Sequence, residues 1–93
     1  MMATITFTVP PSWSTEAELD ELTCEAPTVG AAIEWFADRY PSLRKRYLTV
    51  AGDIAPWALV TLDHVDVRTL SGLNTCVASS EGEIGIIAAL MGG

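Results

Sequence analysis

The residues best suited to chemistry in this sequence are the last two, Gly92 and Gly93, which follow Leu90 and Met91. Glycine has no side chain and loses the most conformational entropy when it is ordered, so a diglycine end adds little to a packed fold. Two such residues could instead pass through a narrow slot in a partner protein and present the carboxylate of Gly93 to chemistry there. The alternative is an ordinary frayed tail, and the rest of the chain must decide between the two.

The side chains that usually carry catalysis are scarce and scattered. His64 is the single histidine, and Cys24 and Cys76 stand far apart with no second cysteine or histidine at metal-ligand spacing. The sequence contains no Ser-His-Asp set, no zinc-protease motif and no phosphate-binding loop. We expect both cysteines to be reduced, buried thiols, and His64 to be a solvated turn residue. A chain this small without a catalytic set is better interpreted as a carrier or partner protein than as an enzyme, with no metal and no stably bound cofactor.

Composition excludes several classes of partner. The net charge of −7 argues against nucleic acid, because phosphate binding needs clustered cations and Arg44-Lys45-Arg46 is too short a run. Acidity of this kind suits a partner with a basic surface. No apolar stretch approaches the roughly 20 residues of a membrane span, and no secretory signal opens the chain, so we expect a cytoplasmic protein that does not contact the membrane. Its length predicts one domain over residues 1–93, with a flexible tail at 90–93.

The first half of the chain predicts two strands and one long helix. Residues 3–9 alternate threonine with apolar residues, which is typical of a strand with one buried face. Residues 19–24 predict a weaker, edge-prone strand that pairs with the first as a hairpin. Thr28 is a helix N-cap candidate, and Pro41 ends the helix. The apolar stripe of this helix is expected to comprise Val29, Ile33, Phe36, Ala37 and Tyr40.

The second half predicts three more strands. Residues 57–62 form a strong strand, Asp63-His64 a tight turn, and residues 65–68 a short returning strand. Gly82 closes a turn over residues 79–82 and suits a positive φ, and residues 83–89 form a strand apolar enough to be central. The order β-β-α-β-β-β predicts an α+β fold, a mixed sheet of four to five strands packed on one main helix. A right-handed crossover after the first hairpin would place the third strand parallel to the first, as in a β-grasp; order alone leaves a ferredoxin-like sheet as a competitor.

Several segments resemble the MoaD/ThiS-like sulfur carriers, which have the ubiquitin-like β-grasp fold. Residues 59–68 are similar to the family's hairpin, an apolar strand followed by a turn and Glu/Asp-Val-Arg. Residues 70–75 resemble its Gly-Leu-x-Thr stretch, and residues 82–87 its last strand. The end at Gly92-Gly93 matches its terminal diglycine, and the pattern is closest to CysO-like carriers. Ala88-Ala89-Leu90-Met91 departs from the family, which often has a proline in the last strand and an Ala-Gly-Gly end, and His64 stands where glycine is common.

The resemblance implies a function that the residues alone do not give. An E1-like adenylating enzyme would use ATP to activate the carboxylate of Gly93, and a sulfur donor would displace AMP to leave a thiocarboxylate. A sulfur-acceptor synthase would then take the sulfur for a cysteine, cofactor or natural-product pathway. Gly92 would give access to a narrow opening, and Leu90 and Met91 would contact the partner, although Leu90 could equally end the core strand.

Two other functions remain open on the sequence. A ubiquitin-like modifier would need the same tail and the same activation, but would form an isopeptide bond from Gly93 to a lysine. A non-catalytic β-grasp interaction domain would carry its glycines incidentally. Such a domain would tolerate residues added after Gly93, which the first two functions would not.

Overall fold

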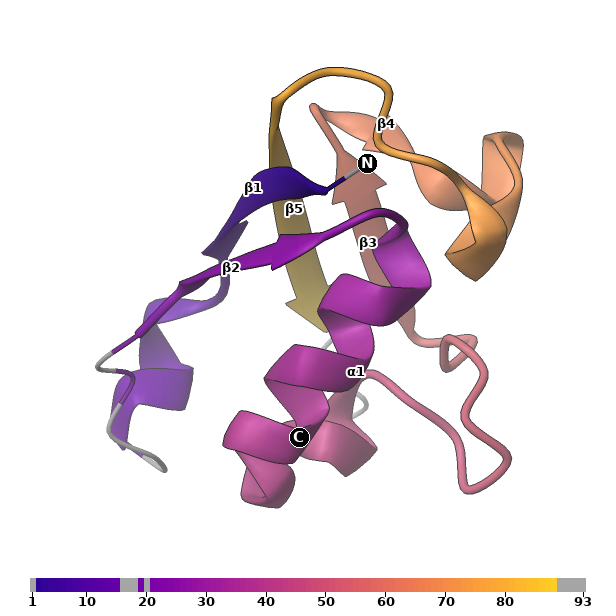
Figure 1. Ribbon diagram of the computed structural model, residues 1–93. Helices are drawn as coiled ribbons and strands as arrows, with labels where there is room; N and C mark the ends of the chain where they lie inside the picture. The colour runs from indigo at the N-terminus through magenta and orange to yellow at the C-terminus, as the bar shows by residue number, and fades with distance from the viewer. Residues whose placement is uncertain (1, 16–18, 20, 89–93) are drawn as a thin grey trace.

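The computed structural model describes residues 2–15, 19 and 21–88, and it contains one mixed sheet and one main helix (Figure 1). The elements are β1 (Ala3–Thr8), β2 (Thr23–Ala26), α1 (Val29–Arg39), β3 (Ala58–Leu62), β4 (Val65–Asp66) and β5 (Glu81–Ala88). The sheet has five strands in the order β2-β1-β5-β3-β4. Among the described residues, four 3₁₀ turns connect these elements, at Pro11–Thr15, Pro41–Arg46, Val67–Thr69 and Gly72–Asn74. The predicted α+β architecture is confirmed.

The last strand, not the third, is the parallel neighbour of β1. β5 lies between β1 and β3, pairing in parallel with β1 and antiparallel with β3. The prediction that the third strand would run parallel to the first is therefore wrong, whereas the prediction of a central last strand is confirmed. β5 takes the middle because Ile84 and Ile86 are both fully buried and need neighbours on each side.

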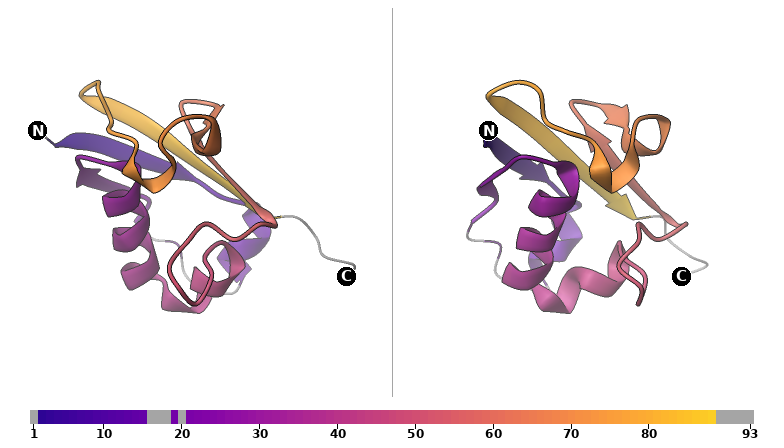
Figure 2. Two further views of the ribbon diagram at one scale, coloured as in Figure 1. Left: turned by 90° about the vertical axis from the view of Figure 1, so that its right-hand side faces the viewer. Right: turned by 45° about the vertical axis from the view of Figure 1, so that its right-hand side comes forward.

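One face of the sheet packs on α1, and Figure 2 shows the helix and the segment after it on that side only. Strand β1 alternates as predicted, with Ala3, Ile5 and Phe7 buried and the threonines between them exposed. Aromatic rings join the layers, since the ring of Phe36 lies 4.8 Å from that of Phe7 and 5.8 Å from that of Tyr47. Trp13, for which the sequence predicted no buried position, is 4% exposed and stacks on Tyr47.

The helix begins and ends where the sequence predicts. Thr28 caps it, because its Oγ1 accepts a hydrogen bond from the Ala31 amide at 3.1 Å. It ends before Pro41, and the whole predicted apolar stripe is buried. Tyr40 then ties the helix end to the segment before β2, as its hydroxyl donates to the Glu21 carbonyl at 2.7 Å. No helix among the described residues is long and apolar enough to cross a membrane.

The hairpin after β3 is shorter than predicted. The turn at Asp63-His64 is confirmed, with both residues in the left-handed region at φ 50° and 71°. The returning strand stops at Asp66 instead of continuing to Arg68. Two features end it: Val67 turns into the core with no exposed surface, and Asp66 Oδ1 accepts a hydrogen bond from the Arg68 amide at 2.9 Å. Asp66 therefore caps the 3₁₀ turn at Val67–Thr69 that follows the strand.

Three smaller predictions are also corrected. Gly82 lies inside β5 and has no positive φ; its lack of a side chain matters because a Cβ there would come within 3.1 Å of Val77 Cγ1. Cys24 is buried as predicted, and burial raises the pKa of its thiol, but Cys76 is exposed because it alternates with the buried Thr75 and Val77. Strand β2 covers residues 23–26 and not 19–24, since pairing of Ala3 with Ala26 sets its register.

Candidate functional site

The face of the sheet opposite α1 carries a different set of side chains from the packed face. On β1 it presents threonines, and on β3 it presents Leu59 and Thr61. Strand β5 contributes Glu83, Gly85 and Ile87 to this open face. Ile87 is 56% exposed and Leu59 is 36% exposed, and the two are register partners. An apolar pair therefore stands uncovered at the end of β5 that precedes the tail.

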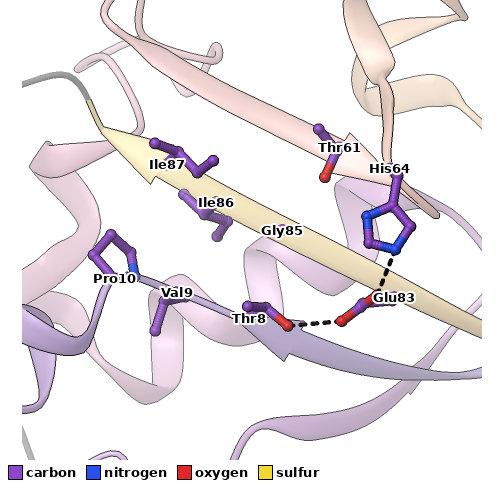
Figure 3. A pocket seen from close by; sticks show the side chains of 9 residues that line it. All are labelled: Thr8, Val9, Pro10, Thr61, His64, Glu83, Gly85, Ile86 and Ile87. Atoms are coloured by element: carbon purple, nitrogen blue, oxygen red, sulfur yellow. Dashed lines mark hydrogen bonds and ion pairs between the residues drawn. The ribbon is translucent and has the colours of Figure 1, made fainter.

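A hollow of about 350 Å³ lies on this face, above Gly85 (Figure 3). Gly85 is paired with Thr8 of β1 on one side and Thr61 of β3 on the other. A side chain at Gly85 would fill the hollow, and its Cβ would stand 2.7 Å from Thr61 Oγ1. Glycine is required here for close approach and not for backbone conformation. The lining residues are Thr8, Val9, Pro10, Thr61, His64, Glu83, Gly85, Ile86 and Ile87.

The two ends of the hollow differ in polarity. At one end, the Glu83 carboxylate accepts a 2.8 Å hydrogen bond from Thr8 Oγ1, and its other oxygen lies 3.4 Å from His64 Nε2 (Figure 3). At the other end, the lining residues Val9, Pro10 and Ile87 are apolar. The hollow thus offers an apolar recess toward the tail and an anionic group away from it.

Arg68 anchors the start of β3, the strand that lies beside the end of β5. Its guanidinium donates to the carbonyl of Ala58 at 2.7 Å and to that of Ala55 at 2.6 Å. Ala58 is the register partner of Ala88, the last described residue of β5. In the sequence Arg68 is part of the family's Glu/Asp-Val-Arg pattern, and no local signal shows that its side chain reaches back ten residues to the start of β3.

The predicted site residues themselves lie outside the described part of the chain. These are Leu90, Met91, Gly92 and Gly93, whose roles remain predictions. Among the described residues, no group of three or more histidine, cysteine or acidic side chains could hold a metal ion. The His64 side chain is 88% exposed, as expected of a turn residue. The Asp63 side chain joins the turn to β5, since its Oδ1 accepts from the Glu83 amide at 3.0 Å.

Comparison with solved structures identifies the architecture. Small archaeal modifier protein 1 from Methanosarcina acetivorans superposes with a TM-score of 0.82, at 21% identity over 100% of this chain and 99% of the other. A chain of the BexX/CysO complex from Amycolatopsis orientalis gives 0.73, at 24% identity over 96% and 99%. Urm1 from Trypanosoma brucei gives 0.68, at 14% identity over 99% and 97%. The chain has the ubiquitin-like β-grasp fold.

The β-grasp match confirms the fold that the sequence resemblance implied. No family model matches the chain, and no curated protein matches it in sequence. Identities of 14% to 24% establish the β-grasp and nothing finer. Function therefore has to be argued from the open face and from the residues that follow Ala88.

Proposed function

We propose that this β-grasp protein is a sulfur carrier whose chemical group is the C-terminal carboxylate of Gly93. This role requires that Gly93 be the last residue of the mature protein. A free C-terminal carboxyl group has a pKa of about 3.3–3.7, so it is ionised at neutral pH and needs activation before it can react. The carrier supplies the tail, and the chemistry of activation belongs to a partner enzyme.

The proposed reaction has two steps, adenylation and displacement of AMP by sulfur. The Gly93 carboxylate attacks the α-phosphate of ATP on an E1-like adenylating enzyme, which gives the acyl adenylate and pyrophosphate. A hydrosulfide-class donor then attacks the carbonyl carbon, so that a C–S bond forms while the C–O bond to AMP breaks. The product is a thiocarboxylate, whose soft sulfur anion is the group that a sulfur-acceptor synthase would take. Gly92 would let the tail enter a narrow slot because it has no Cβ.

One observation carries the proposal: the uncovered apolar end of the open face stands at the end of β5, directly before the tail. Ile87 and Leu59 expose apolar surface there without contributing to the core. Such surface suits a protein contact, and a contact at this place would bring the partner to the residues after Ala88. The similarity to a chain of the BexX/CysO complex supports contact with a partner protein. We assign Leu90 and Met91 to the same contact.

The test is intact-mass measurement after incubation with ATP, a sulfide source and the adenylating enzyme of the source organism. We expect the mass to rise by the exchange of one oxygen for sulfur. A chain lacking Gly93 should melt at the same temperature as the full chain and gain no sulfur. A chain with one alanine added after Gly93 should also fail. Sulfur transfer by either variant would contradict the proposal.

A second candidate function is that of a protein modifier, because small archaeal modifier protein 1 superposes on this chain with a TM-score of 0.82. A modifier would join Gly93 to lysine side chains through the same acyl adenylate. Peptide mapping of cell extract distinguishes the two functions. Cleavage after Met91 with cyanogen bromide would leave a Gly-Gly remnant on each modified lysine. A remnant that depends on this protein would favour the modifier, and its absence alongside thiocarboxylate formation would favour the carrier.

A further inference from the structure

The hollow above Gly85 has a carboxylate held in place at one end. Glu83 Oε2 accepts the 2.8 Å hydrogen bond from Thr8 Oγ1, and Glu83 Oε1 lies 3.4 Å from His64 Nε2 (Figure 3). The Glu83 side chain is 45% exposed, so a group from outside can reach it. A carboxylate can accept about four hydrogen bonds, and these contacts therefore leave room for a further donor.

The lysine and arginine side chains of this protein lie away from the hollow. All five belong to the described residues. Four of them, in α1 and the 3₁₀ turn at Pro41–Arg46, are on the opposite side of the sheet (Figure 2). The fifth, Arg68, binds backbone carbonyls at the start of β3. Of the described residues, only His64 lies within ion-pair distance of Glu83, and its side chain is 88% exposed and can move aside.

Two further carboxylates lie on the same face of the sheet. Thr4 of β1 is the register partner of Glu81 on one side and of Glu25 on the other. Register partners share a face, and Thr4 is one of the exposed threonines of the open face. The polar end of the hollow therefore borders an acidic part of the sheet, which attracts a cation.

The two ends of the hollow restrict what can occupy it. A group that covers the apolar end, at Val9, Pro10 and Ile87, also removes water from Glu83. A wholly apolar group would leave that carboxylate without solvent or a cation, which is unfavourable. Lysine and arginine combine an aliphatic stem with a cationic head, so either side chain suits both ends.

We propose that the hollow above Gly85 receives one lysine or arginine side chain of the adenylating partner. The aliphatic stem lies over Gly85, where the absence of a Cβ leaves room, and the cationic head donates to the Glu83 carboxylate. This contact lies beside the exposed Ile87 and so brings the partner close to the tail. The identity of the partner rests on the proposed function, whereas the preference of the hollow for such a side chain does not.

The first measurement uses the free protein and needs no partner. The probes are n-butylguanidinium and n-butylammonium chloride, with n-butanol as the uncharged control, added at constant ionic strength while amide resonances are recorded by NMR. We expect the Glu83 and Gly85 amides to shift and saturate with a Kd on the order of tens of millimolar, as suits so small a ligand. Glu83→Gln should abolish saturation. Shifts that do not saturate, or that n-butanol reproduces, would overturn the proposal.

The second measurement compares Glu83→Gln with the matched control Glu81→Gln in ATP–pyrophosphate exchange by the adenylating enzyme. Both variants remove one negative charge from the open face, and the glutamine at position 83 can still accept from Thr8. We expect KM for this protein to rise about tenfold in Glu83→Gln, the effect of one lost charged hydrogen bond, with kcat unchanged. Glu81→Gln should change KM less than about twofold, since it removes only a distant charge.

Equal KM values for the two variants would overturn the proposal. If the unaltered protein is not adenylated at all, the proposed function fails, and the NMR titration alone decides whether the hollow takes a cationic side chain.

Discussion

Ile86 and Ile87 are adjacent and chemically identical, yet they belong to two different surfaces. Ile86 has no exposed surface and packs in the core beneath α1, whereas Ile87 is 56% exposed on the open face. The alternation of a strand is the whole cause of the difference. One face of β5 therefore stabilises the fold, while the other face is free to contact a partner.

The same division runs along the neighbouring strands. The inner face of β1 is apolar and the outer face is threonine, which tolerates both water and a protein contact. The hollow above Gly85 lies on the outer face, and the aromatic rings lie on the inner face. Substitutions on the two faces should therefore affect different measurements.

The largest expected effect is on the inner face. Ile86→Ala removes a fully buried side chain, so we expect the free energy of unfolding to fall by about 2–5 kcal/mol. Urea denaturation measures this change. Ile87→Ala is the matched control and should stay within about 0.5 kcal/mol of the unaltered protein. Equal losses of unfolding free energy for the two variants would show that the two faces of β5 contribute alike to stability.

A side chain that fills the hollow above Gly85 should lower the free energy of unfolding. Gly85→Ala places a Cβ 2.7 Å from Thr61 Oγ1, which must shift, and we expect a cost of about 1–2 kcal/mol in urea denaturation. The double variant with Thr61→Ala should recover most of that stability, because the clashing atom is gone. Failure of the second substitution to restore stability would show that the cost arises elsewhere than at this contact.

Substitutions on the open face should change the KM with which a partner enzyme uses this protein. Ile87→Ala removes apolar surface that a partner would bury, so under the proposed function we expect KM for this protein in adenylation to rise about tenfold with kcat unchanged. The measurement is ATP–pyrophosphate exchange at varied carrier concentration. Lys45→Ala, on the exposed side of the 3₁₀ turn at Pro41–Arg46, is a surface control that should leave KM unchanged. An unchanged KM for Ile87→Ala would remove Ile87 from the contact.

The smallest expected effect concerns Tyr47, a polar group on the inner side. Its buried hydroxyl has no hydrogen-bond partner among the described residues, so Tyr47→Phe should leave stability at pH 7 unchanged or raise it by up to about 1 kcal/mol. Burial raises the pKa of Tyr47 above its ordinary value of 10.0. The folded state therefore favours the neutral phenol, and this contribution is complete below pH 10 and is lost as the pH rises through the folded-state pKa. Tyr47→Phe should lose less stability than the unaltered protein between pH 10 and pH 12, as measured by urea denaturation.

Patterns of neighbouring residues determined where several strands and the helix begin and end. The alternation in β1, the N-cap at Thr28 and the stop at Pro41 depend on residues close in sequence, and each prediction is confirmed. The resemblance to sulfur carriers gave the right fold through the order of short motifs. The roles assigned to Gly92 and Gly93 rest on the sequence alone, because they lie outside the described residues.

Only the tertiary structure decided which strands became neighbours, because pairing depends on long-range packing that no local pattern encodes. It placed β5 beside β1, brought the Arg68 side chain to the start of β3 and turned Cys76 outward. The sequence predicts that Pro10 stops a strand. Only the pairing of β1 with β5 shows where this stop lies, since Thr8 and Gly85, the last paired residues, are far apart in the chain and meet across the sheet.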